Sequence, residues 1–140
     1  MSDEFSSRGR TVTEADVLAF AALTGDWHPQ HADAEWAARS EFGERIAHGM
    51  LIASLAVGLV DFDPETVLAL RRVREVVFKR PVRLGDTIHV EGGESERRPV
   101  GDETALAIWN WRIVNQHGDL VCRMQLEAVV RTAAAAAEAA

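Results

Sequence analysis

The chain has 140 residues, of which 47% are hydrophobic and 26% are charged. That length fits a single domain with a real core, and that composition excludes a disordered, fibrous or disulfide-rich protein. The formal net charge of -7 disfavours a general binder of nucleic acid or anionic membranes, since such proteins rely on positive potential. The single cysteine, Cys122, cannot form an internal disulfide, and the N-terminal residues lack the apolar run of a signal peptide. We therefore expect a cytoplasmic protein without a nucleic-acid or membrane partner.

The first half of the chain is predicted to be helical. Thr13 with acidic residues in the next turn is typical of a helix start, and Gly25 is typical of a helix end. Pro29 favours an extended residue before it, so residues 26–31 are predicted to be a tight loop. The apolar run over residues 50–60 predicts a central helix that other structure must cover.

The second half is predicted to be a sheet, because from residue 67 the hydrophobic period changes from about 3.6 to 2. Short turns between consecutive strands favour antiparallel pairing, and helices grouped before the strands favour an α+β layer arrangement. Residues 92–103 are rich in glycine and charge and are expected to be an exposed connection. The predicted strands cover residues 73–79, 87–91, 104–114 and 122–130.

One domain is predicted, over residues 13–131. The polar residues 1–12 are expected to form a loose N-terminal segment. Residues 132–140 are rich in alanine, which favours a helix, but they have little to pack against. We therefore expect this end of the chain to be a frayed tail.

Chemically reactive side chains are concentrated in residues 25–31, Gly-Asp-Trp-His-Pro-Gln-His. Asp26 and His31 lie five residues apart after the first predicted helix, in a loop of the kind that often carries catalytic groups. A carboxylate and an imidazole that converge there can divide the transfer of protons between them. An aspartate after glycine is equally typical of a turn, and a histidine in a loop is often a polar surface residue. From this segment alone, both interpretations stay open.

Three ordered motifs carry a resemblance to a known family. They are residues 24–31, Thr-Gly-Asp-Trp-His-Pro-Gln-His; residues 42–51, Phe-Gly-Glu-Arg-Ile-Ala-His-Gly-Met-Leu; and residues 80–87, Arg-Pro-Val-Arg-Leu-Gly-Asp-Thr. Together they resemble the MaoC-like dehydratase family, which includes the (R)-specific enoyl-CoA hydratases, and the likeness runs over about residues 13–130. The resemblance implies the hot-dog fold, in which a curved antiparallel sheet wraps around a central apolar helix, and it implies a homodimer.

The resemblance also implies an activity, the reversible hydration of a 2-enoyl thioester to an (R)-3-hydroxyacyl thioester. By this resemblance Asp26 and His31 are the catalytic pair, and the backbone N–H of Gly49 helps to bind the thioester oxygen as it becomes enolate-like. An exposed N–H at a helix start suits that task. The acyl group would be carried by coenzyme A or by an acyl carrier protein, and no cofactor is expected other than coenzyme A as part of the substrate.

His28 stands where the family signature has Asn, so a larger, titratable ring replaces a neutral amide. We expect His28 to support the loop, and we count it with His48 among the candidate substrate-binding residues. For His48, the alternative is a buried ring satisfied by a neighbouring carbonyl. These histidines could also gather with Asp26 or Asp33 around a metal, but His-X-X-His with a proline inside is not a helical ligand spacing, so no metal is predicted.

Basic residues gather between positions 71 and 83 of this acidic chain. They are interpreted either as a solvated strand edge that opposes aggregation, or as contacts for the phosphates of coenzyme A or for the acidic face of a carrier protein. The candidate phosphate contacts are Arg72, Arg74, Lys79, Arg80 and Arg83.

Three other functions stay open at this point. A hot-dog thioesterase would share the fold and the acyl-thioester substrate, but it would release a free thiol. A non-catalytic acyl-thioester binding module, or one half of a heteromeric hydratase, would keep the binding groove with altered chemistry, and the His28 substitution is the one feature that favours it. A metal-dependent hydrolase would require bound metal.

Overall fold

The structure, a computed structural model, describes residues 4–139, which form one sheet and several helices. The helices are α1 (Glu14–Thr24), α2 (Pro29–Ala32), α3 (Ala34–Ala38), α4 (Gly49–Leu59) and α5 (Ala133–Ala139). The strands are β1 (Phe5–Ser6), β2 (Arg10–Thr11), β3 (Val67–Phe78), β4 (Thr87–Pro99), β5 (Thr104–Val114) and β6 (Leu120–Arg131).

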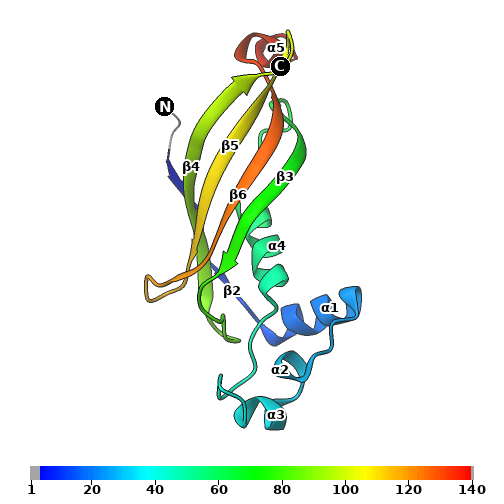
Figure 1. The fold of residues 1–140 in the computed structure, drawn as a ribbon, viewed down its shortest axis with the longest axis vertical. Helices are drawn as coiled ribbons and strands as arrows, with labels where there is room; N and C mark the ends of the chain where they lie inside the picture. The colour runs from blue at the N-terminus through cyan, green and yellow to red at the C-terminus, as the bar shows by residue number, and fades with distance from the viewer. Residues whose placement is uncertain (1–3, 140) are drawn as a thin grey trace.

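The strands form one antiparallel sheet in the order β1-β4-β5-β6-β3, and β2 also pairs with β4. The sheet is open and curves past α4, whereas α1, α2 and α3 gather at one end of the molecule (Figure 1). This arrangement confirms the predicted α+β class with a curved antiparallel sheet around a central apolar helix.

Helix α4 packs into the curve of the sheet because most of its side chains are apolar. Its buried residues, which include Leu51, Ile52 and Leu59, pack in one core with Trp111 and Ile113 of β5. Burying each large apolar side chain of this kind contributes roughly 1.5–3 kcal/mol. One side of α4 is left open, since Met50 is 59% exposed and Ser54 is exposed. None of the helices in residues 4–139 has the length and apolar character needed to cross a membrane.

The N-terminal segment belongs to the sheet, which corrects the expectation that residues 1–12 are loose for the part that the structure describes. Phe5 of β1 pairs with Gly92 of β4, and Arg10 of β2 pairs with Ile88. The ring of Phe5 also packs edge-on against Trp111, with 6.4 Å between ring centroids. The long β4 edge offers backbone groups that need partners, and even two-residue strands satisfy some of them.

Two further expectations are corrected at the other end of the sheet. Residues 92–99, predicted to be an exposed connection, continue β4 and pair with β5 as far as Pro99. Their charged side chains are compatible with a strand because most of residues 95–99 are exposed. The alanine-rich end, expected to be frayed, forms α5, in which Ala135 is 6% exposed.

Helix α1 begins with a reciprocal cap. The backbone N–H of Asp16 donates to Thr13 Oγ1 at 3.2 Å, and the N–H of Thr13 donates to Asp16 Oδ2 at 2.9 Å. Arg10 of β2 donates to both carboxylate oxygens of Asp16 at 2.9 and 3.0 Å. These bonds, with the one from Arg10 foremost, hold the pKa of Asp16 well below its usual range. The carboxylate therefore ties the start of α1 to the edge of the sheet.

This cap predicts a pH-dependent contribution to stability. We expect Asp16→Asn to lower the free energy of unfolding at pH 7 by about 1 kcal/mol, as for loss of a helix cap. Because the folded-state pKa is depressed, the contribution of the carboxylate is complete above the unfolded-state pKa of about 3.9 and declines as pH falls below it. Urea unfolding at pH 7, 5 and 3 should show the two proteins converging toward low pH. A difference that stayed constant with pH would contradict this account, and Asp102→Asn, in an exposed turn, is the control.

Candidate active site

Asp26, His31 and His48 come together near the N-terminal end of α4, and Gly49 directly follows His48 as the first residue of that helix. Each of the three side chains of Asp26, His31 and His48 has one carboxylate oxygen or ring nitrogen that lies within 4.8 Å of the corresponding atoms of the other two. Asp26 is exposed, whereas His31 is 4% and His48 is 2% exposed. The site thus joins a solvent-accessible carboxylate to two buried imidazoles.

Asp26 is placed by the end of α1. Gly25 has a φ of 82°, a left-handed conformation that favours glycine, and its N–H donates to Ala21 O at 2.8 Å. The backbone N–H of Asp26 then donates to Thr24 Oγ1 at 3.2 Å, and its Oδ1 accepts from the N–H of His28 at 3.3 Å. The carboxylate is therefore held in a turn directly after the helix.

His28 begins the short helix α2. Its Nδ1 accepts from the N–H of Gln30 at 3.0 Å, and Pro29 occupies the first turn, where its missing N–H is not needed. The prediction of a tight loop over residues 26–31 is therefore wrong for residues 29–31, which lie in this helical turn. The ring of His28 also meets Trp36 edge-on at 5.3 Å. With Nδ1 used as a cap, only Nε2 is left to contact a substrate.

His31 lies inside α2 with its two ring nitrogens in different roles. Nδ1 is 2.7 Å from the carbonyl oxygen of Ile46, and a carbonyl only accepts, so Nδ1 carries the proton. Nε2 then presents its lone pair, with Nε2 of Gln30 3.4 Å away. Burial lowers the pKa of His31, and the neighbouring His48 acts in the same direction. A neutral ring with an unprotonated Nε2 can act as a proton acceptor once a water takes the place of the Gln30 amide at Nε2.

His48 lies against His31 with the rings nearly parallel, 3.7 Å between centroids and 25° between planes. Its Nε2 is 2.9 Å from the backbone carbonyl oxygen of Asp26. This contact matches the alternative in which a buried histidine is satisfied by a carbonyl. Nδ1 is buried without a hydrogen-bond partner among the described residues, so any contact of His48 with a substrate would use Nδ1.

Gly49 is the first residue of α4, where backbone N–H groups have no acceptor within the helix. A Cβ atom at position 49 would lie 2.9 Å from the ring of Phe78, so glycine is what allows this close approach. Gly49 and Phe78 line a groove of about 360 Å³ together with Lys79 and Arg80. An anionic oxygen in this groove would meet the positive end of the helix dipole.

The structure separates the five basic residues that were predicted as phosphate contacts. Lys79 and Arg80 line the groove at Gly49, and neither has a side-chain ion pair within the described part of the chain. The other three do not line that groove and have partners of their own. Arg72 Nε lies 3.8 Å from Glu127, Arg74 bonds to Gln125, and Arg83 donates to Phe42 O at 2.7 Å.

The three clustered donors also form a set that could hold a metal ion, with the carboxylate of Asp26, Nε2 of His31 and Nδ1 of His48 available. Among the described residues, this set does not include His28. That no metal is needed stays a prediction.

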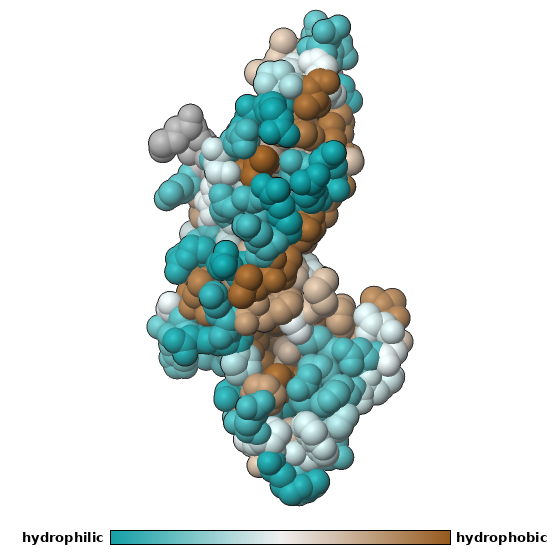
Figure 2. Space-filling model, in the orientation of Figure 1, coloured by the Kyte–Doolittle hydropathy of each residue, from teal (hydrophilic) through white to brown (hydrophobic). Residues whose placement is uncertain are grey.

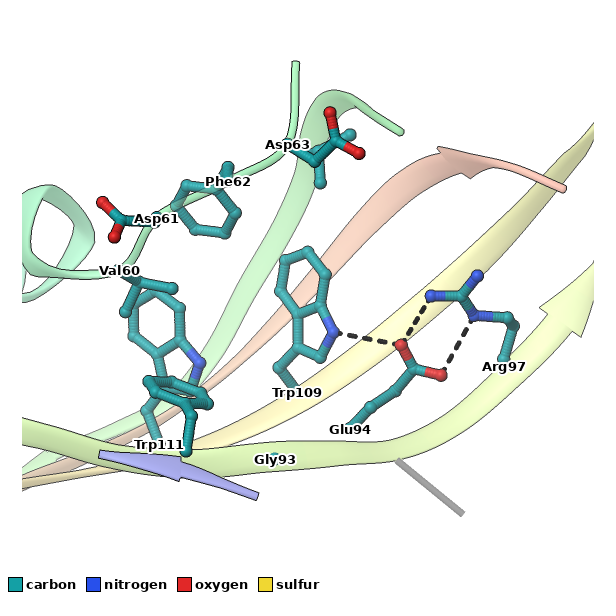
Figure 3. A pocket seen from close by; sticks show the side chains of 11 residues that line it. Val60, Asp61, Phe62, Asp63, Gly93, Glu94, Arg97, Trp109 and Trp111 are labelled. Carbon is teal, nitrogen blue, oxygen red and sulfur yellow. Dashed lines mark hydrogen bonds and ion pairs between the residues drawn. The ribbon is translucent and has the colours of Figure 1, made fainter. Parts of the chain in front are cut away.

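A second hollow, of about 390 Å³, lies at the opposite end of α4, which as an 11-residue helix is about 16 Å long. Trp109 and Phe62 face each other there with 5.5 Å between ring centroids, and Trp109 donates to Glu94 at 3.3 Å (Figure 3). Glu94 is also paired with Arg97 at 2.7 Å. Sequence patterns gave no signal for this hollow or for Phe78 at the groove, because both depend on how distant segments pack.

The chain matches the family model of the MaoC like domain over residues 3–110. It is 36% identical over 117 residues to the (R)-specific enoyl-CoA hydratase of Aeromonas caviae, and the match covers 84% of each chain. It is 41% identical over 116 residues to the protein MaoC of Klebsiella aerogenes, a match that covers 79% of this chain and 34% of that longer protein. The chain therefore spans most of one relative and about a third of the other.

Solved structures agree with this relationship. A monoamine oxidase regulatory protein from Archaeoglobus superposes with a TM-score of 0.89 and 34% identity, over 94% of this chain and 90% of its own. A Mycobacterium tuberculosis protein with a double hotdog fold superposes with a TM-score of 0.80, over 94% of this chain and 42% of that one, and its 19% identity speaks for the fold alone. The predicted hot-dog fold is confirmed. Since the family model spans most of the sequence, including the motifs of residues 24–31 and 42–51, the chain belongs to the MaoC-like dehydratase family.

Proposed function

We propose that the protein is a hydro-lyase that reversibly hydrates 2-enoyl thioesters to (R)-3-hydroxyacyl thioesters. The observation that carries this proposal is the clustering of Asp26 and His31 with His48, the residue that directly precedes Gly49 at the start of α4. The activity named for the Aeromonas relative, with which the chain shares 84% of its length, supports the proposal and gives the configuration of the product.

In the hydration direction, the thioester oxygen accepts a hydrogen bond from the N–H of Gly49. One water molecule donates to the Asp26 carboxylate and to Nε2 of His31, which leaves an oxygen lone pair directed at C3 of the enoyl group. As the C3–O bond forms, one proton of the water passes to the pair and the thioester becomes enolate-like, stabilised by the start of α4. The pair then returns a proton to C2. Dehydration reverses these steps.

The acyl carrier in this proposal is coenzyme A, with Lys79 and Arg80 as the contacts for its phosphates. Both line the groove that begins at Gly49, and both are exposed, so they can meet a charged ligand without first losing an ion pair among the described residues. Arg72, Arg74 and Arg83 would have to exchange their present partners to do the same. No cofactor enters this reaction, because Asp26, His31 and the Gly49 amide supply the chemistry.

The assembly in this proposal is a homodimer formed along β3. This strand is at the edge of the sheet, and Leu68, Leu70 and Val73 are 44%, 51% and 43% exposed. Hydrophobic surface runs along the side of the sheet on which β3 lies (Figure 2). An exposed apolar edge strand favours pairing with a second chain. We place the enzyme in the cytoplasm, since its single cysteine is buried and needs no oxidising compartment.

The central test uses purified protein with a panel of 2-enoyl-CoA thioesters. We expect the conjugated enoyl absorbance to fall without release of free thiol. Asp26→Asn and His31→Ala should each lower kcat by at least about 100-fold, as for loss of a general acid or base. The matched controls Asp102→Asn and His117→Ala change exposed residues in turns away from the site and should stay near the wild-type rate.

Other outcomes of that assay would contradict the proposal in distinguishable ways. Release of thiol would indicate a thioesterase. Loss of turnover after chelation, with recovery on adding metal, would indicate a metal-dependent enzyme. Binding of the thioesters without any change in absorbance would indicate a binding module.

The assignment of the carrier predicts a difference between two substrates with the same acyl group. Lys79→Ala and Arg80→Ala should each raise KM for the coenzyme A thioester about fivefold, the size of one exposed ion pair of roughly 1 kcal/mol. For the N-acetylcysteamine thioester, which has no phosphate, KM should be unchanged. Arg123→Ala, an exposed basic residue on β6, is the control. Equal effects on both substrates would contradict phosphate recognition.

The homodimer predicts a mass of twice the 15.4 kDa of one chain in light scattering. Leu70→Lys with Val73→Lys places charges on the apolar edge and should shift the protein toward the monomer. Val100→Lys replaces an apolar residue that is 53% exposed but lies in the turn after β4, and it should leave the mass unchanged. A wild-type monomer, or a double variant that stays dimeric, would contradict an interface along β3.

A further inference from the structure

His48 contacts each of the three groups to which the proposed reaction is assigned. Its Nε2 lies 2.9 Å from the carbonyl oxygen of Asp26, and its ring stacks on His31 at 3.7 Å between centroids. It is also the residue directly before Gly49, at the start of α4. The ring of Phe20 also packs against His48, with 5.0 Å between centroids and 60° between planes. The ring is therefore fixed, and 2% exposed, in the middle of the site.

The hydrogen bond from His48 ties Asp26 directly to the residue before α4. The other hydrogen bonds of residues 25–28, between α1 and α2, join residues two to four positions apart in the sequence. Such local bonds define the shape of a turn but not its position relative to α4. Among the described residues, the bond from His48, 22 positions away, is the long-range one. It joins the backbone of Asp26 to the N-cap of α4.

The unpartnered Nδ1 of His48 indicates that folding stability alone does not explain why position 48 carries a histidine. The carbonyl of Asp26 only accepts, so Nε2 carries a proton. Nδ1 is left buried without a partner among the described residues, which is unfavourable. An aromatic ring without nitrogen would fill the same space between Phe20 and His31 and avoid this penalty. What phenylalanine could not supply is the donor to Asp26.

We propose that His48 is a positioning residue for the hydration reaction, an inference that rests on the proposed function. Its Nε2–H holds the backbone of Asp26, its ring holds the ring of His31, and its backbone leads directly into Gly49. In this way one side chain fixes the acid–base pair relative to the amide that receives the thioester oxygen. His48 itself exchanges no proton with the substrate.

Three variants separate the two contacts of the side chain. His48→Gln keeps an N–H donor that can reach the carbonyl of Asp26 but loses the ring. His48→Phe keeps a ring against His31 but loses the donor. His48→Ala loses both. The folded fraction of each variant is measured by circular dichroism at the assay temperature, and rates are expressed per folded protein.

We expect kcat of His48→Ala and His48→Phe with the enoyl-CoA thioester to fall at least about 100-fold, while KM changes less than about threefold. Small misplacements of reacting groups have effects of this size on the chemical step and leave substrate binding intact. His48→Gln should recover at least tenfold of the loss. If His48→Ala does not fold, a kcat at least tenfold higher for His48→Gln than for His48→Phe supports the same inference.

Several results would overturn the inference. These are kcat within threefold of wild type for His48→Phe, equal impairment of the Gln and Phe variants, or an effect confined to KM. A wild-type protein that turned over none of the thioesters would instead overturn the proposed function, and with it the reaction for which His48 positions the groups. Wild-type turnover therefore tells the two failures apart.

Discussion

The packing of α4 against the curved sheet determines where this protein can do chemistry. Leu51, Ile52 and Leu59 bury one side of the helix in the core, so its axis and its N-terminus are fixed. The first-turn N–H groups of a helix lack acceptors and carry partial positive charge, which makes this end the natural place for an oxygen that gains negative charge. In the proposed reaction Asp26 and His31 act at that point, and the N-terminal half of the chain places them beside His48, the residue before α4.

Residues 46–49, which precede and begin α4, form a junction that connects α4 to the elements around it. The N–H of Ile46 donates to the carbonyl of Gln30 at 3.0 Å, and its carbonyl accepts from His31. The N–H of Ala47 donates to Val82 at 2.8 Å, in the connection between β3 and β4. Two regions of the chain, α2 and the connection between β3 and β4, are thereby tied to the segment that leads into α4. A rigid junction of this kind keeps groups from separate elements in register with little loss of entropy when a substrate binds.

The sequence predicts the parts of this structure that have local signals. The period of β5 and β6, the apolar run of α4 and the ordered motifs around Asp26 and Gly49 were sufficient for the fold class and the proximity of the site residues. The paired segments of β1 and β2 are too short to show a period. The second half of β4 was hidden by charged residues, because pairing with β5 and not burial keeps it extended.

The basic cluster shows a different limit. Arg72 and Arg74 contact side chains of β6, whereas Lys79 and Arg80 line the groove at Gly49. The difference depends on two register shifts in β3, between Leu70 and Arg72 and between Arg74 and Val77. Glu75, in the second shift, has a φ of 54°. No periodicity in the sequence marks such bulges, since each one moves the following side chains to new positions. Sequence patterns also cannot predict the contact of His48 with Asp26, because it joins residues that lie 22 positions apart in separate parts of the fold.

The cap that His28 provides to α2 has a consequence for what this ring can recognise. Its Nδ1 accepts the N–H of Gln30, so the ring proton of this tautomer is on Nε2. The one polar group of the side chain that is not used in the cap is therefore a hydrogen-bond donor. A partner of His28 has to be an acceptor, such as a carbonyl or phosphate oxygen, and the same bond that shapes the turn before His31 thereby restricts the chemistry that the turn can contact.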